Sequence, residues 1–237
     1  MANEGSVAKS KTLKKVLLIC AYVVAVLSVA RVIWLYSGSN RWEFVGEQNG
    51  VKIYSLKTPG DDVKKFKAVF QIHSTLAGLV KYMQDPHACD DYGCENAHTL
   101  EYEDDTLQYS LFQVRLPGPF KKREFVLRQQ FHQDPRTKAI LVVYTAAPDK
   151  APPDPCCLRV TDMANTWLLT PKGDGLVEIE YVVNMNEGGF MPELFKNLVR
   201  PKFMYPLKNL EGFVNREKYQ TAKFDFVQEL GAGQAIR

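Results

Sequence analysis

The chain has 237 residues, and 46% of them are hydrophobic, which is enough for one domain of ordinary size with a short appendage. Its 30 Lys and Arg residues exceed its 27 Asp and Glu residues by a net charge of +3, which is too small to indicate a nucleic-acid partner. The sequence contains no serine-hydrolase elbow, no zinc-protease motif and no glycine-rich phosphate loop. We therefore expect no catalytic residues, no cofactor and no enzyme activity.

A basic N-terminus followed by an apolar run is the first feature along the chain. Residues 1–15 carry four lysines, and residues 16–36 are apolar apart from a few positions such as Arg31. The run has about the twenty residues that a helix needs to cross a bilayer, and it ends in Trp34 and Tyr36, which are typical of the membrane interface. The pattern predicts a single-pass membrane anchor. Because lysines favour the cytoplasmic side, we expect the domain on the other side, in the periplasm if the host is a bacterium.

A cleaved signal peptide is the alternative for the same segment. Ser28-Val29-Ala30 resembles a small-residue processing site after a short apolar core, and cleavage there would give a secreted protein. Apolar residues continue past this site, which favours the anchor. Both alternatives export the rest of the chain.

A linker at residues 37–41 leads to the main domain, which we expect over residues 42–222 before a tail at 223–237. Period-two hydrophobic patterns bounded by turn residues predict a series of strands. The expected strands are 51–56, 66–72, 98–102, 106–114, 124–132, 140–146, 158–170 and 176–185. A short helix near residues 76–83, capped by Ser74 or Thr75, follows the first two strands.

The segment 188–218 is predicted to form a long amphipathic helix. Two glycines precede it, Pro192 suits its first turn, and apolar residues recur at helical spacing. Pro201 and Pro206 should kink or divide this helix because each removes an interior hydrogen bond. A run of strands followed by a long helix predicts an α+β fold with an antiparallel sheet.

Three segments, in order and at similar spacing, resemble START domains, the steroidogenic-acute-regulatory-related lipid transfer family. Trp42 with residues 50–54 is similar to the family's opening, and residues 114–127 (VRLPGPFKKREFVL) resemble its P-x-P and R-[DE]-[FY]-V motifs. Residues 185–192 (MNEGGFMP) resemble its N-P-G-G-x-[IL]-P motif. The resemblance implies a helix-grip fold, in which a curved antiparallel sheet wraps around the long C-terminal helix and encloses a tunnel for one lipid. It also implies a non-enzymatic, membrane-anchored lipid carrier, which we expect to be a monomer that contacts a membrane surface.

The strand patterns indicate which side chains face the tunnel. Gln129 shares one face of its strand with apolar side chains, so its amide meets either a ligand or a neighbouring side chain such as Ser110. The candidate ligand-binding residues are Ser110, Phe125, Leu127, Gln129, Phe131, Tyr144, Met163, Trp167, Ile179, Tyr181, Val183, Phe195 and Leu198.

Departures from the family's patterns indicate which class of lipid the cavity favours. Cholesterol-type members often carry an Arg at the position of Gln129, paired with an acidic residue near the position of Ser110, and neither charge is present here. The phosphatidylcholine-binding member carries an Arg and an Asp in the region that corresponds to residues 89–93, and it carries aromatic residues near the positions of Val182 and Val183. Both features are missing from this chain. A neutral lining favours a sterol-like molecule or an acyl chain, and a phospholipid remains open.

Two cysteines and two histidines lie within twelve residues and allow two interpretations. His87, Cys89, Cys94 and His98 offer zinc ligands, but their spacing is not that of a standard finger, so we assign no metal site. A disulfide between Cys89 and Cys94 is the other possibility, and it suits an exported domain. Cys156-Cys157 allows further pairings.

Two other functions remain open beside lipid binding. One is a hydrolase or cyclase on the same helix-grip fold, which would turn over a substrate in the cavity. The other is a membrane-tethered interaction module whose cavity is filled by side chains, which would purify without lipid.

Overall fold

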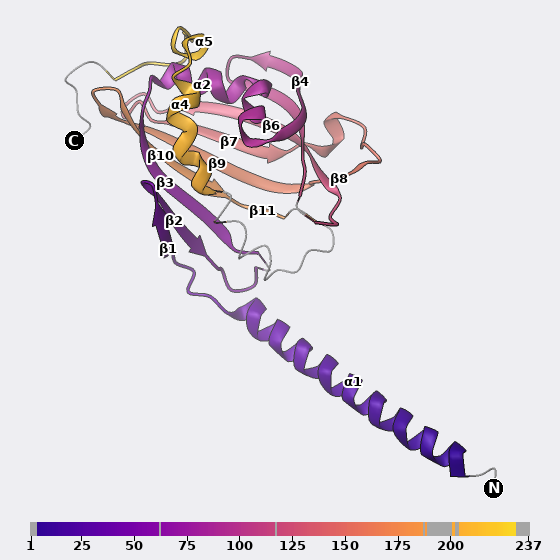
Figure 1. Ribbon diagram of the computed structural model, residues 1–237. Coiled ribbons are helices and arrows are strands. Elements are labelled where there is room, and N and C mark those ends of the chain that lie inside the picture. Colours follow the sequence, from indigo (N-terminus) through magenta and orange to yellow (C-terminus); the bar gives the residue numbers. More distant parts are fainter. Residues whose placement is uncertain are drawn as a thin grey trace. The chain divides into compact units, whose positions relative to one another are not determined.

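The computed structural model describes residues 4–61, 63–116, 118–186, 188, 201 and 204–230 (Figure 1). The chain divides into two compact units. The first comprises Met1–Arg41 together with Leu56–Asp62, and the second comprises Trp42–Ser55 together with Val63–Arg237. Each unit is described by itself.

The first unit consists of helix α1 (Glu4–Tyr36) and the segment that meets its C-terminal end. Leu13–Tyr36 is a stretch of 24 residues with a mean hydropathy of 2.6, so it is long and apolar enough to cross a membrane. A signal sequence near the N-terminus can have the same length and composition. The carbonyl oxygen of Leu35 accepts hydrogen bonds from the N–H of Gly60 at 2.8 Å and from Nζ of Lys57 at 3.2 Å. These bonds satisfy a backbone carbonyl that the end of the helix would otherwise leave unpaired.

The second unit is built on one large sheet. Its strands are β1 (Glu43–Gln48), β2 (Val51–Leu56), β3 (Lys65–His73), β4 (Cys94–Asp104), β5 (Leu107–Val114), β6 (Lys122–Gln133), β7 (Ile140–Ala146), β8 (Cys157–Arg159), β9 (Asp162–Gly173), β10 (Leu176–Val183) and β11 (Met185–Asn186). The order across the sheet is β1-β2-β3-β10-β9-β7-β6-β5-β4, while β8 pairs with β6 and β11 pairs with β9. The fold is α+β, with a curved, open antiparallel sheet and a C-terminal helix, as the sequence predicts.

Most predicted strands appear near their expected bounds, and three differences have physical reasons. Strand β1 was not predicted because nearly all of its side chains are exposed, so its sequence carries no alternation. The single strand expected over 158–170 divides into β8 and β9, and the short β8 runs parallel to β6. The strand expected over 176–185 is interrupted at Asn184, whose N–H bonds the side-chain Oδ1 of Asn165 at 2.8 Å instead of continuing the ladder.

The short helix α2 (Leu76–Gln84) begins as predicted at the cap residue Thr75, whose Oγ1 accepts the N–H of Gly78 at 3.0 Å. The carboxylate of Glu229 accepts the N–H groups of Leu76 and Ala77 at 3.0 and 2.9 Å, which secures the C-terminal segment to this helix. The 3₁₀ helix η1 (Pro86–Tyr92) follows directly.

The long C-terminal helix predicted over 188–218 falls partly outside the described residues. Its described part consists of the 3₁₀ turn η3 (Tyr205–Asn209), α4 (Leu210–Val214) and α5 (Glu217–Gln220). Pro206 lies in the first turn of η3, so the regular helix resumes only after this proline, as predicted. Helix α4 packs against α2 and β3 (Figure 1).

Two hydrophobic clusters fill different parts of this unit. The larger one joins α2 and α4 to β2, β3, β7 and β10, and includes Ile53, Phe66, Leu79, Ile179 and Leu210, all no more than 2% exposed. The smaller cluster has Phe125, Leu127 and Val160 as its buried members. The partly buried side chains of Phe112, Tyr144 and Met163 pack against this second cluster and border the cavity described next.

Candidate functional site

A largely apolar cavity of about 210 Å³ lies between the sheet and the helices α2, η1 and α4. Strands β5, β6, β7, β9 and β10 supply one wall, and α2, η1 and Leu210 of α4 supply the other. Six of the predicted ligand-binding residues line it: Ser110, Leu127, Tyr144, Met163, Trp167 and Tyr181. The strand patterns therefore locate the sheet side of the cavity.

Seven predicted residues are not found in this lining. Phe131, Ile179 and Val183 are buried in the larger hydrophobic cluster, where protein side chains cover them. Phe125 lies in the smaller cluster and stacks on Phe112, with 4.9 Å between ring centroids. Gln129 lies behind the wall, and Phe195 and Leu198 fall outside the described residues.

The amide of Gln129 is 1% exposed and makes its hydrogen bonds to protein groups. Its Oε1 accepts from Nε2 of Gln108 at 2.6 Å, and its Nε2 donates to the carbonyl of Met83 at 2.9 Å and to the hydroxyl of Tyr144 at 2.7 Å. The bond to a neighbouring strand that the sequence allowed therefore exists, but its partner is Gln108, not Ser110. Gln129 positions Tyr144, and the tyrosine is the residue that reaches the cavity.

Asn165 is a cavity residue that the sequence analysis missed. It lies between Met163 and Trp167 on the same face of β9, so the period-two pattern that selected its neighbours also applies to it. Its Oδ1 accepts the N–H of Asn184, and its Nδ2 donates to the hydroxyl of Tyr181 at 3.4 Å. The ring of Tyr181 stacks on Trp167 with 4.1 Å between centroids, which fixes the phenol in the wall.

The hydroxyls of the cavity tyrosines stay protonated at neutral pH. Burial raises the pKa of Tyr144 well above its usual value and raises the pKa of Tyr181 to about 12. These groups act as neutral hydrogen-bond donors and acceptors. The wall therefore offers aromatic surface and phenol groups to whatever occupies the cavity.

Asp85 is the one charged side chain among the described residues of the lining. Its Oδ2 accepts from Nζ of Lys218 and from the hydroxyl of Tyr219, both at 2.9 Å. Partial burial pushes the pKa of Asp85 upward, but hydrogen bonds from Lys218, from Tyr219 and from the N–H of His87 outweigh burial and hold the pKa below its usual value. The carboxylate is thus engaged in joining the start of η1 to α5.

A second ion pair joins the same two regions. The guanidinium of Arg216 donates two hydrogen bonds to the carboxylate of Asp91, at 2.9 and 2.7 Å, and Tyr82 donates to Asp91 at 3.3 Å. The rings of Tyr92 and Phe213 meet edge to face beside this pair, with 5.7 Å between centroids. We call the Arg216–Asp91 and Lys218–Asp85 pairs together the C-terminal clasp. The clasp holds the α4–α5 segment against the helical wall of the cavity.

The charged residues of the R-E-F-V motif have structural partners away from the cavity. Arg123 is 2% exposed and donates from Nη2 to the carbonyl of Gly188 at 3.1 Å, so it connects two of the three motifs that carry the family resemblance. Glu124, also 2% exposed, pairs with Arg159 at 2.5 Å. This buried charge pair could not be predicted from the sequence, because Glu124 and Arg159 lie on different strands and are 35 residues apart.

Arg159 also organises the proline-rich loop that precedes β8. Its guanidinium donates to the carbonyls of Pro148, Ala151 and Pro152 at 2.5, 2.9 and 2.9 Å, in addition to its bonds to Glu124. A buried charge pair with this many hydrogen bonds is well compensated. The pair therefore fastens the loop to β6 beside the smaller hydrophobic cluster.

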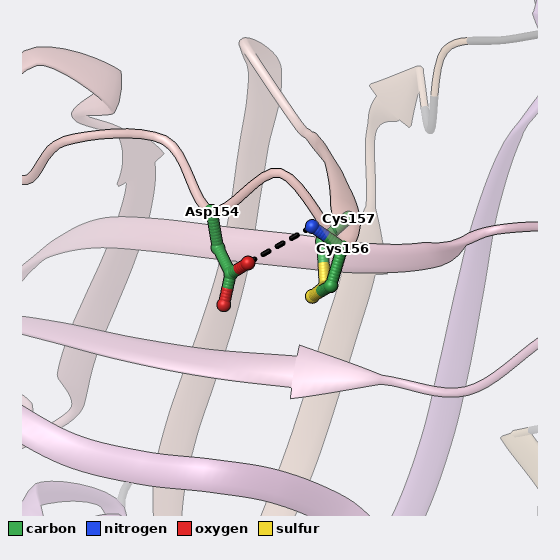
Figure 2. A group of neighbouring side chains, drawn as sticks. All are labelled: Asp154, Cys156 and Cys157. Atoms are coloured by element: carbon green, nitrogen blue, oxygen red, sulfur yellow. Dashed lines mark hydrogen bonds between the residues drawn. A yellow bond between two sulfur atoms is a disulfide. The ribbon is translucent and has the colours of Figure 1, made fainter.

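Four of the five cysteines form two disulfides in the structure. Cys89 is bonded to Cys94, which ties η1 to β4, and His98 bonds the carbonyl of Asn96, so the suggested His and Cys set does not converge on one point. Cys156 is bonded to its neighbour Cys157, and Asp154 accepts the N–H of Cys156 at 2.9 Å. Figure 2 marks this hydrogen bond with a dashed line. The other oxygen of Asp154 accepts from Gln113 at 3.2 Å. These three side chains lie close enough to hold a metal, but with the sulfurs joined they act as a loop anchor.

The comparisons with known proteins show which solved structures share this fold. No family model matches the chain. An uncharacterized protein of Pseudomonas aeruginosa is 25% identical over 176 residues, which cover 72% of this chain and 84% of that protein. Among solved structures, the STAR-related lipid transfer protein from Xanthomonas axonopodis is similar with a TM-score of 0.68 and 22% identity, covering 74% of this chain and 99% of that one.

Two human structures have a similar fold at lower sequence identity. The human StAR-related lipid transfer protein 5 matches with a TM-score of 0.62 and 15% identity, over 83% of this chain and 96% of that one. The lipid transfer and protein localization domain of human StarD13 matches with a TM-score of 0.66 and 13% identity, over 81% and 96% of the two chains. The described domain therefore has the START helix-grip fold.

Proposed function

We propose that this chain is a membrane-tethered lipid carrier that holds one lipid in the cavity between the sheet and the C-terminal segment. The single observation that carries the proposal is the cavity itself, which has an apolar and aromatic wall inside a helix-grip fold. Such a cavity suits a ligand that is mostly hydrocarbon and buries it from water. The similarity to lipid transfer domains supports the same role.

The lining of the cavity suits a lipid carrier better than it suits an enzyme. The one carboxylate in its described lining, that of Asp85, is already engaged by Lys218 and Tyr219, so it is poorly placed to move a proton. Trp167 and Tyr181 stack on each other and present flat apolar surface instead of a reactive group. We propose binding and transfer of a neutral lipid, sterol-like or acyl, by a monomer.

The N-terminal helix provides the tether in this proposal. Lys9 and Lys11 precede the stretch Leu13–Tyr36, and Lys14 and Lys15 lie at its start. These four lysines favour a cytoplasmic N-terminus with the lipid-binding domain on the opposite side. Intact-mass measurement on protein from membranes tests retention: an anchor keeps residues 1–30, and loss of these residues would show a cleaved signal. Fusion of alkaline phosphatase to the C-terminus in a bacterial host should give an active enzyme, whereas inactivity would place the domain in the cytoplasm.

Trp167 provides a direct test of lipid binding because it lines the cavity. In a full-length Trp34→Phe/Trp42→Phe variant, Trp167 is the one remaining tryptophan of three. We expect brominated lipid delivered from donor vesicles to quench its fluorescence saturably, at one lipid per chain. A Trp167→Phe variant that keeps the other two tryptophans is the matched control for quenching within the bilayer. Absence of saturable quenching by brominated sterol, fatty acid and phosphatidylcholine alike would overturn the proposed function.

A further inference from the structure

Two tyrosine hydroxyls in the cavity wall each accept a hydrogen bond from a fixed side-chain amide. Nε2 of Gln129 must be the nitrogen that donates to Tyr144, because the same atom lies 2.9 Å from the carbonyl of Met83, which only accepts. Nδ2 of Asn165 likewise faces Tyr181, because Oδ1 of Asn165 is used by the N–H of Asn184. Both phenol oxygens therefore act as acceptors toward the protein.

The phenol protons are left to point elsewhere. A hydroxyl that accepts one bond from an amide still has its own O–H to donate. Within the described part of the chain, neither Tyr144 nor Tyr181 donates that proton to a protein acceptor. Both residues line the cavity, and burial raises the pKa of each, so both O–H groups persist at neutral pH. A buried donor without a partner is costly, which favours a ligand that supplies an acceptor.

Tyr82 shows that this arrangement is not shared by every cavity tyrosine. Its hydroxyl oxygen lies 3.3 Å from both the carbonyl oxygen of Ala88 and the carboxylate of Asp91, so these two acceptors share its single proton. The proton of Tyr82 is thus already used within the protein. The two phenols that keep a proton for a ligand, Tyr144 and Tyr181, lie on β7 and β10, on the sheet side of the cavity.

The lining also defines the charge of the group that these donors can meet. No Lys, Arg or His side chain is found among its described residues, and Asp85 is the one acid. A ligand carboxylate or phosphate would have to lose its hydration without a cation to replace it. A neutral oxygen acceptor avoids this cost.

We propose that the cavity selects lipids whose buried end carries a neutral carbonyl group, as in an ester, ketone or amide, and that the O–H groups of Tyr144 and Tyr181 donate to that oxygen. This selection rests on the proposed lipid-binding function. The two fixed amides orient the donors before the ligand arrives, so the specificity is built into the wall.

The test compares probes that share one chain and differ at one end. Dibrominated stearate, its methyl ester and the corresponding dibromo-alkane quench Trp167 through the same bromine atoms in the full-length Trp34→Phe/Trp42→Phe protein. We expect the methyl ester to bind about fivefold to tenfold more tightly than the alkane, the effect of one net hydrogen bond. At neutral pH the ester should also bind more tightly than the carboxylate.

Matched variants assign this preference to the two phenols. Tyr144→Phe and Tyr181→Phe each remove a hydroxyl and keep the ring, so each should reduce the preference for ester over alkane, and the double variant should abolish it. Tyr82→Phe is the control, because it removes a hydroxyl whose proton is already bonded, and it should leave the preference intact.

The outcomes separate this proposal from the one on which it rests. If the alkane and the ester bind saturably but equally, or if the double variant keeps the ester preference, the phenol donors do not select the ligand while lipid binding stands. Tighter binding of the carboxylate than of the ester would overturn the neutral class. If none of the three probes, and none of the other brominated lipids, quenches Trp167, the lipid-binding function itself fails.

Discussion

The inner face of the large sheet has two halves that share the strands β7, β9 and β10, and one half is filled by side chains whereas the other is hollow. On β3 and β10, Phe66 and Ile179 are almost fully buried and pack under the helices. On β7 and β9, Tyr144 and Trp167 keep part of their surface free and border the cavity. Aliphatic and Phe side chains without polar groups close the filled half, whereas large rings with polar partners form the wall of the hollow half.

This contrast teaches that alternation identifies the inner face of a strand but not what covers that face. Ile179 and Tyr181 lie on the same face of β10, yet Ile179 is part of the core and Tyr181 lines the cavity. The difference comes from whether other side chains pack over each residue, and that is a tertiary property.

The hollow half should depend strongly on its polar supports because its buried apolar cluster is small. We predict that Arg159→Leu lowers the free energy of unfolding by ~3–5 kcal/mol, because Glu124 is left as a buried, unpaired charge. Denaturant unfolding of the full-length protein in detergent measures this change. Glu101→Gln, which breaks the exposed pair with Lys150, is the control and should cost under ~1 kcal/mol. Equal effects of the two substitutions would show that the buried pair is not a support.

A pair of truncations tests the comparison between the two halves directly. Ile179→Ala removes a fully buried side chain from the filled half and should lower the free energy of unfolding by ~2–5 kcal/mol. Met163→Ala removes a side chain that borders existing space, so it should cost less stability and weaken lipid binding more. The two halves would not differ as described if Met163→Ala proved the more destabilising change and left lipid binding unaltered.

The C-terminal clasp should slow lipid exchange because it holds one wall of the cavity in place. Arg216→Gln removes the paired bonds to Asp91 and should speed exchange with donor vesicles by up to about fivefold, since a solvent-screened ion pair contributes only modestly. Lys122→Gln, on the sheet side, breaks an ion pair with Glu95 and serves as the control. Exchange rates that do not change in Arg216→Gln would mean that lipid enters elsewhere.

The smallest expected effect is the pH dependence that arises from Asp85. Its pKa is lower in the folded protein than the ordinary value of 3.8, so its contribution to stability is present above that pH and is lost as the pH falls through the folded-state pKa. We expect wild-type protein to lose more thermal stability than Asp85→Asn between pH values of about 5 and 3. Parallel pH profiles of thermal stability for the two proteins would show that Asp85 does not stabilise the protein through the clasp.

Much of the fold could be predicted from the sequence because the signals for its strands, caps and helix breaks come from neighbouring residues. The strand over 140–146 was predicted with the bounds that β7 has, and the Thr75 cap and the Pro206 break depend on neighbouring residues alone. Strand β1 could not be predicted because nearly all of its side chains are exposed, so no alternation of apolar residues marks an inner face. Local pattern thus predicts an element well wherever burial imposes that pattern.

The site was predicted less completely because its polar groups depend on strand register. Gln129 lies opposite both Gln108 and Tyr144 in the sheet, and that pairing decides that the amide serves the protein. Tyr82 and Leu210 come from helices whose placement over the cavity has no local signal. Asn165 could have been found, because it shares its face with Met163 and Trp167.

The central claim, that the hollow half holds a lipid, is tested most directly by photo-crosslinking. Full-length protein in nanodiscs is supplied with a lipid that carries a diazirine in its acyl chain, and the adducts are mapped by peptide mass spectrometry. We predict saturable adducts on the peptides that contain Leu127 and Met163, with one lipid per chain, and competition by unlabelled lipid. Adducts confined to Leu13–Tyr36, where the helix is apolar enough to meet the bilayer itself, would contradict the account.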